Sequence, residues 1–124
     1  MKFSRVAVGG TFDNLHLGHE VLIEKAFEVG EYVIVGVVSD EMAGNKDVQG
    51  FAERKKALES FLSKFKNYEI VRLEEPYGPA VSDPSIRAIV VSEETEERAR
   101  EINEIRKKKG IPLLDVIIVP FVLA

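Results

Sequence analysis

The sequence has no cysteine and no tryptophan, and no hydrophobic run that approaches membrane-spanning length. Without cysteine there can be no disulfide framework, no thiolate nucleophile and no cysteine-ligated metal, so nothing points to an oxidising compartment. Met1-Lys2 leads directly into a charged strand rather than into the apolar region of a signal peptide. We therefore expect a cytoplasmic protein that is not associated with a membrane.

The sequence also has no excess of basic residues over acidic ones. The 17 Lys and Arg residues face 21 Asp and Glu residues, which gives a net charge of -4. A nucleic-acid-binding surface would need a clustered basic face, so we expect no nucleic-acid partner, whereas a small anion needs only a local basic site. The 124 residues, of which 45% are hydrophobic, predict a single domain over residues 1–124.

Short apolar runs alternate with stretches of helical periodicity along the chain. Strands separated by helices imply right-handed crossovers, so the sequence predicts an α/β fold: a Rossmann-like five-stranded parallel sheet with helices on both faces. In such sheets ligands bind beyond the carboxyl ends of the strands. Strands are expected at residues 3–8, 32–38, 68–73, 88–92 and 115–119, helices at 17–29, 52–65 and 93–109, and loops at 42–50 and 74–84.

The first strand-to-helix junction reads Gly-Gly-Thr-Phe-Asp-Asn-Leu-His-Leu-Gly-His over residues 9–19. Gly9 and Gly10 carry no Cβ, so a ligand can approach the backbone closely. Thr11 and the surrounding amides can donate hydrogen bonds, and the helix that begins near Leu17 directs its unpaired N–H groups to the same place. The junction is therefore predicted to bind phosphate. It matches neither G-x-G-x-x-G nor a P-loop.

Two histidines lie three residues apart at the start of this helix, with Gly18 between them. On a first helical turn this spacing places His16 and His19 on one side, where both can donate to one phosphate. The same pair with Asp13 as a third ligand could instead hold a metal, but that alternative leaves the glycines unexplained.

Residues 9–13 together with residues 16–19 resemble the G-T-F-D and H-x-G-H signature of the nucleotidylyltransferase superfamily. Four later segments, at residues 39–42, 76–79, 90–95 and 102–106, resemble the archaeal-type phosphopantetheine adenylyltransferases. The resemblance covers nearly the whole chain. The first motif defines only the superfamily, whereas the later segments narrow the resemblance to one branch.

The resemblance implies adenylyl transfer from ATP to 4′-phosphopantetheine, which gives dephospho-coenzyme A and pyrophosphate in coenzyme A biosynthesis. Dephospho-coenzyme A or coenzyme A is then the expected product ligand. Mg²⁺ is the expected cofactor, held through the phosphate oxygens of ATP and by no protein ligand. Two alternatives stay open: a transferase for another phosphorylated acceptor (phosphocholine, glycerol phosphate, nicotinamide mononucleotide or flavin mononucleotide), and a nucleotide-binding module without useful activity.

The site residues follow from the junction and from the resemblance, which also implies a lysine at position 46 that contacts phosphates of both substrates. Expected catalytic residues are His16, His19 and Lys46. Expected ATP and phosphate contacts are Gly9, Gly10, Thr11, Phe12, Asp13, Gly18, Ser92 and Glu93. Expected substrate contacts are Thr11, Lys46, Tyr77, Asn103 and Arg106.

Three polar residues in predicted helices are further candidates for ligand contacts. Arg54 starts the second long helix, where a cation opposes the helix dipole, so it is a candidate for an anion contact. Asn103 and Arg106 share a stripe with Ala99 and Ile102 and therefore need partners. The resemblance places an asparagine at position 103 near the pantetheine arm.

Two departures from the resembled family concern phosphate binding. Bacterial members have arginines after the fourth strand, whereas this chain has Ser-Glu-Glu-Thr at residues 92–95, as the archaeal type does. The phosphate charge must then be met elsewhere. The family also continues into an I-S-S-T-x-x-R segment that contacts ATP phosphates, and this sequence ends at Ala124 without one.

Overall fold

A computed structural model describes residues 2–44 and 47–120. Its strands form one sheet in the order β3-β2-β1-β4-β5, and every adjacent pair is parallel. This confirms the predicted five-stranded parallel sheet. The strands are β1 (Val6–Gly10), β2 (Val33–Val38), β3 (Tyr68–Leu73), β4 (Ala88–Ser92) and β5 (Asp115–Val119).

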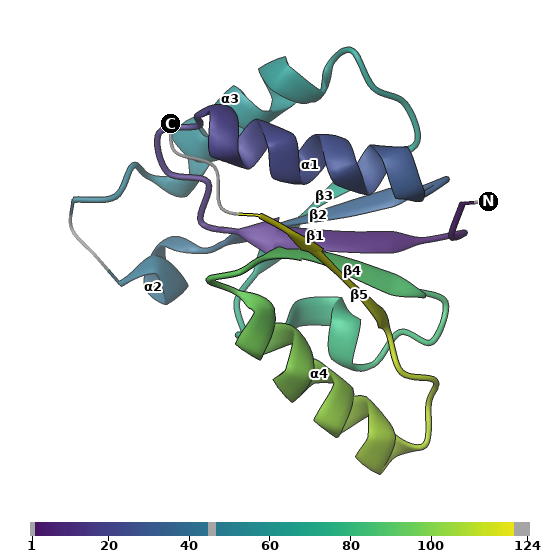
Figure 1. The fold of residues 1–124 in the computed structure, drawn as a ribbon. Coiled ribbons are helices and arrows are strands. Elements are labelled where there is room, and N and C mark those ends of the chain that lie inside the picture. Colours follow the sequence, from purple (N-terminus) through teal and green to yellow (C-terminus); the bar gives the residue numbers. More distant parts are fainter. Residues whose placement is uncertain (1, 45–46, 121–124) are drawn as a thin grey trace.

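Helices cover both faces of the sheet (Figure 1). α1 (Leu17–Val29) and α3 (Phe51–Leu62) lie on one face, and α4 (Glu96–Lys109) lies on the other. Two short helices belong to the loops that follow strands, α2 (Asp40–Ala43) after β2 and the 3₁₀ helix η1 (Gly78–Val81) after β3.

Side chains that alternate along each strand divide the interior into two cores. Val6 and Val8 of β1 pack with residues of α1 and α3, whereas Ala7 between them packs with residues of α4 and η1. All six residues of β2 are buried, as expected for a strand covered on both faces. The sheet therefore separates two layers, each of which supplies one wall of the candidate site.

The first strand begins later than expected, and the chain before it approaches Gly30. Phe3 makes only an isolated bridge with Gly30, and β1 begins at Val6. Gly30 follows α1 with a φ of -119°. A Cβ at this position would lie 2.6 Å from Cγ2 of Val6, so the glycine allows a close approach rather than a left-handed turn.

Two predicted loops contain short helices. α2 forms after β2 because the Ser39 hydroxyl accepts the Met42 amide at 3.1 Å and caps it. η1 interrupts residues 74–84 where proline follows Gly78. The last helix was expected from residue 93, but it begins at Glu96 because residues 92–95 first form a turn, and it ends at Gly110 with φ +74°.

The helix expected at residues 52–65 ends at Leu62, since Phe65 N donates to Leu62 O and Asn67 adopts a positive φ of 62°. No helix among the described residues combines the length and the apolar character needed to cross a membrane.

Candidate active site

The loop after β1 has an unusual backbone. Phe12 and Asn14 adopt positive φ values of 54° and 46°. Such a conformation is costly for an aromatic residue and persists only where the surroundings impose it. The ring of Phe12 is buried, and its edge meets His19 with ring centroids 5.5 Å apart. The loop is therefore fixed to the first turn of α1 by side-chain packing.

The segment before α3 holds the same loop from the other side. Gln49 N donates to Asp13 Oδ1 at 2.9 Å, and its own Oε1 accepts the Asn14 amide at 3.0 Å. Arg54 donates to the carbonyl of Thr11 at 2.9 Å. Gln49 was not predicted as part of the site, and no pattern in the sequence marks it, because its partners lie more than thirty residues away.

His16 and His19 lie on one side of the first turn, as predicted. Their rings stack with centroids 3.9 Å apart. Nδ1 of His16 accepts the Gly18 amide at 3.0 Å, and Nδ1 of His19 accepts the His16 amide at 3.2 Å, so the two side chains form a capping box. Because both Nδ1 atoms accept, the proton of each neutral ring is on Nε2. Both Nε2–H groups can then donate to a phosphate oxygen.

The environment favours the neutral form of His19. Burial lowers the pKa of His19 below 6.5, the charge of His16 lowers it further, and Asp13 raises it in part. A neutral His19 keeps Nδ1 as an acceptor for the cap and Nε2–H as a donor. The capping geometry and the protonation state therefore both leave Nε2–H of His19 as a donor for a phosphate oxygen.

The alternative metal set of His16, His19 and Asp13 does not form. Both histidine Nδ1 atoms accept backbone amides, Asp13 Oδ1 accepts the Gln49 amide, and Asp13 Oδ2 accepts Asn14 Nδ2 at 3.2 Å. Within residues 2–44 and 47–120, no group of three or more His, Cys, Asp and Glu side chains is placed to hold a metal ion. The available groups at this loop are N–H and O–H donors, which suit phosphate oxygens.

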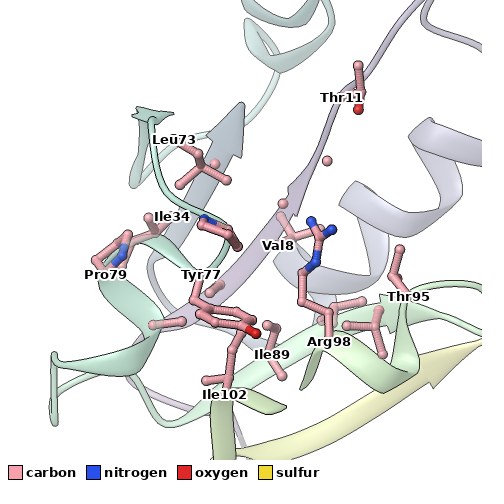
Figure 2. A pocket seen from close by; sticks show the side chains of 18 residues that line it. Val8, Thr11, Ile34, Leu73, Tyr77, Pro79, Ile89, Thr95, Arg98 and Ile102 are labelled. Carbon is pink, nitrogen blue, oxygen red and sulfur yellow. The ribbon is translucent and has the colours of Figure 1, made fainter. Parts of the chain in front are cut away.

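A cavity of about 230 Å³ opens on the other face of the sheet, beneath the carboxyl ends of β1 and β4 (Figure 2). Its wall is largely aliphatic, and its polar groups gather toward Thr11, Thr95 and Arg98. Gly9, Gly10 and Thr11 of the predicted phosphate loop belong to the lining. The apolar part of the wall includes Ala7, Ile34, Leu73, Pro79, Ile89 and Ile102.

Tyr77 lines this cavity, where it was predicted to contact substrate. Its hydroxyl donates to Glu101 Oε2 at 3.0 Å, and this hydrogen bond raises the pKa of Tyr77 above 10.0. At the end of β4, the Ser92 amide donates to Thr95 Oγ1 at 3.0 Å, and Glu93 is exposed. Thr95 lines the cavity, whereas Ser92 and Glu93 are not part of its lining.

The candidate anion contact of Arg54 is made within the protein, to the carboxylate of Asp40. The side chain is fully buried, and its guanidinium donates to the carbonyls of Gln49, Thr11 and Val38 and to Asp40 Oδ1. Four of its five N–H groups are thus engaged. Arg54 joins the loop after β1 to the end of β2 and to the start of α3, so it positions the phosphate loop from beneath.

Arg106, predicted to contact substrate, is not part of the cavity lining. Its guanidinium is fully buried and donates to four carbonyls, of Pro112, Ala80, Asp83 and Ile86. Burial lowers the pKa of Arg106, although a guanidinium remains protonated. Since Ala80 lines the cavity, Arg106 holds the cavity wall from behind.

Asn103 makes a two-way contact with the start of β5 instead of facing the cavity. Its Nδ2 donates to Leu114 O at 3.1 Å, and its Oδ1 accepts the Leu114 amide at 2.8 Å. Asn103 is not part of the cavity lining, and its predicted substrate contact stays a prediction. Lys46 lies outside the described residues, and its predicted role stays a prediction.

Comparison with known proteins agrees with this geometry. A family model described as cytidylyltransferase-like matches residues 7–119. The phosphopantetheine adenylyltransferase of Methanothermobacter thermautotrophicus is 49% identical over 99% of this chain and 77% of its own length. That of Methanopyrus kandleri is 46% identical over 98% of this chain and 82% of its own length.

Solved structures show the same fold. A protein of unknown function from Archaeoglobus fulgidus superposes with a TM-score of 0.85 at 34% identity, over 95% of this chain and 99% of its own. A lipopolysaccharide core biosynthesis protein from Thermoplasma volcanium has a TM-score of 0.69 at 20% identity, over 98% of both chains, and supports the fold alone. The chain therefore belongs to the cytidylyltransferase-like family of nucleotidyltransferases and, within it, to the branch of the archaeal phosphopantetheine adenylyltransferases.

Proposed function

We propose that the protein transfers the adenylyl group of ATP to 4′-phosphopantetheine, giving dephospho-coenzyme A and pyrophosphate, a step of coenzyme A biosynthesis. The observation that carries this proposal is the aliphatic cavity that ends at the phosphate loop. An acceptor with a long, weakly polar arm and a terminal phosphate matches both parts of this space. Family membership points to the same substrate.

The alternative acceptors match the cavity less well. Glycerol phosphate and the cationic head of phosphocholine would gain little from a wall made of Ala7, Ile34, Ile89 and Ile102. Nicotinamide mononucleotide carries a charged ring and a ribose, whose polar groups would lose water there without finding partners. The methyl and methylene groups of the pantetheine arm gain from the same burial.

Reaction requires the acceptor phosphate and the α-phosphate of ATP to meet near Thr11. An acceptor oxygen forms a bond to the α-phosphorus while the bond from that phosphorus to the oxygen of the leaving pyrophosphate breaks. The acceptor phosphate is largely ionised at neutral pH, so it needs no general base. The protein then has two tasks. It aligns the acceptor phosphate with the α-phosphate, and it stabilises the negative charge that develops on the transferred group.

The phosphate loop supplies donors for that charge. Nε2–H of His16 and of His19 can reach one phosphate from the first turn of α1, and the hydroxyl and backbone of Thr11 lie at the end of β1. Lys46 is proposed as a further cation in the loop after β2. Because the donor set consists of N–H and O–H groups, Mg²⁺ would be carried by the nucleotide oxygens, where it offsets their negative charge.

Pyrophosphate release with ATP and Mg²⁺ tests the proposal across a panel of acceptors. We expect 4′-phosphopantetheine to be used faster than phosphocholine, glycerol phosphate, nicotinamide mononucleotide and flavin mononucleotide. Unphosphorylated pantetheine serves as the matched control, because it fills the cavity but lacks the nucleophile. Faster release with another acceptor would assign the protein to a sister activity, and no release with any of them would leave a nucleotide-binding module.

A further inference from the structure

Arg98 in the first turn of α4 lines the cavity, and its guanidinium has no hydrogen-bond or ion-pair partner among the residues that the structure describes. Its side chain is exposed, and Figure 2 shows the guanidinium extending from α4 toward the end of β1, beside Val8 and Thr95. Within the described residues, the guanidinium makes neither a hydrogen bond nor an ion pair. Arg98 was not among the residues predicted from the sequence.

Other arginines nearby have their charges met by the protein. Arg106 donates to four carbonyls. Arg100, two residues further along α4, pairs with Glu96 and Glu97. Arg98 differs from both because its charge is directed into a mostly aliphatic cavity, where water would be displaced by a ligand.

No feature of α4 itself explains a cation at this position. Arg98 is the third residue of the helix, where a positive charge opposes the helix dipole. Glu101, the acidic residue one turn later, accepts the hydroxyl of Tyr77 instead. The cavity lining that surrounds the guanidinium contains threonine hydroxyls but no carboxylate. An anionic ligand would supply the missing partner.

The face of the sheet on which Arg98 lies indicates whether it binds the acceptor phosphate or a phosphate of ATP. His16 and His19 begin α1 on one face, whereas Arg98 belongs to α4 on the opposite face (Figure 1). The cavity that receives the acceptor arm lies on the α4 face and leads past Arg98 to Thr11. The phosphate of an acceptor seated there would reach Arg98 before it reaches the histidines.

We propose that Arg98 binds the phosphate of the acceptor and directs it toward the α-phosphate held on the histidine side. This assignment rests on the proposed function. A guanidinium keeps its proton at all relevant pH values, so it leaves the acceptor phosphate ionised and nucleophilic. It also offsets the repulsion between that phosphate and the triphosphate of ATP. This chain has Ser-Glu-Glu-Thr at residues 92–95, at the end of β4, where bacterial members have arginines. Arg98 lies about one turn further along and offsets the negative charge of the acceptor phosphate instead.

Calorimetric titration with two ligands, 4′-phosphopantetheine and pantetheine, tests the assignment. In Arg98→Ala we expect the affinity for 4′-phosphopantetheine to fall about 10- to 100-fold, the size of one or two charge-assisted hydrogen bonds. Pantetheine has the same arm without the phosphate, so its affinity should change less than about twofold. Arg98→Lys should recover part of the loss, because it keeps the charge but not the planar fork.

Arg100→Ala is the matched control, since it removes the same side chain from the same helix outside the cavity. It should bind both ligands as the wild type does. The KM for ATP should stay within about twofold of wild type in Arg98→Ala, while the KM for 4′-phosphopantetheine rises with the dissociation constant.

Three results would overturn the assignment. Equal losses for both ligands would mean that Arg98 shapes the cavity, a rise confined to the KM for ATP would place it on the nucleotide, and wild-type affinity would show that it contacts neither. Each is distinguishable from failure of the proposed function, in which the unaltered protein itself would release no pyrophosphate with 4′-phosphopantetheine and would not bind it.

Discussion

Arg54 and Arg106 are fully buried arginines on helices that cover opposite faces of the sheet, and each donates four hydrogen bonds. They differ in what they hold. Arg54 joins the phosphate loop to the end of β2 and to the start of α3, and it has a carboxylate partner in Asp40. Arg106 binds carbonyls alone, three of them from residues 80–86 behind the cavity.

This difference shows that the site has two walls, one supported by Arg54 and the other by Arg106. The donor wall, made of residues 9–19, is polar, and its backbone is strained at Phe12. The apolar wall, made of residues 76–80 and the inner face of α4, is a packed surface. We expect faults in the first wall to appear mainly in kcat, and faults in the second mainly in stability and in acceptor KM.

The largest effect is expected from Arg106→Ala. The substitution leaves four carbonyls without donors and opens a void beneath the cavity wall, so the free energy of unfolding should fall by about 3–5 kcal/mol. Urea denaturation followed by circular dichroism measures this loss.

Arg106→Lys provides the milder variant if the alanine protein does not fold. It should be less destabilised and should show a raised KM for 4′-phosphopantetheine with a kcat near that of wild type. A fall in kcat at unchanged acceptor KM would contradict the separation of the two walls.

Next in size is His19→Ala, which removes an Nε2–H donor and the acceptor of the helix cap. We expect kcat to fall by a factor on the order of 10² to 10³, about 3 to 4 kcal/mol of transition-state stabilisation, with a smaller change in KM. Steady-state pyrophosphate release measures both constants. Glu24→Ala, an exposed substitution on the same helix, is the control. If KM rises while kcat is unchanged, His19 binds the ground state only.

Much of the fold could be predicted because apolar β-branched runs have clear limits. The bounds of β3, β4 and β5 were predicted to the residue, and the helical spacing identified α1, α3 and α4. The short α2 and η1 were missed, since each depends on one local turn rather than on a periodic pattern.

The candidate site was less accessible to prediction. The histidine pair could be found because three-residue spacing at a helix start fixes its geometry, as the stacked rings show. The backbone contacts of Arg54, Asn103 and Arg106 could not be predicted, because a sequence does not show which carbonyls lack donors. Arg98 was overlooked in a charged helix, although it lies four residues before the buried Ile102 and so borders the apolar stripe.

A moderate effect is expected from Arg54→Lys, which keeps the charge but cannot reach all the carbonyls of Thr11, Val38 and Gln49 at once. Stability should fall by about 1–3 kcal/mol. Unlike Arg106→Lys, this variant should also lose about tenfold in kcat, since the strained loop relaxes away from its aligned geometry. Lys56→Ala, an exposed neighbour, is the control. Lower stability with unchanged kcat would show that Arg54 supports the fold without positioning the loop.

The smallest expected effect is a pH dependence confined to the donor wall. Burial lowers the pKa of His19 below 6.5 in the folded protein, so between the folded and unfolded values the unfolded chain binds more protons. The contribution of His19 to stability should therefore be constant above about pH 7 and fall as the pH drops through 6.5. Tyr77 of the apolar wall does not titrate in this range, because its hydrogen bond to Glu101 raises its pKa above 10.0. Thermal unfolding from roughly pH 8 to 5 measures the slope. It should be shallower in His19→Gln, whose amide oxygen can accept the His16 amide but does not titrate. Equal slopes in the two proteins would assign the pH dependence to a group other than His19.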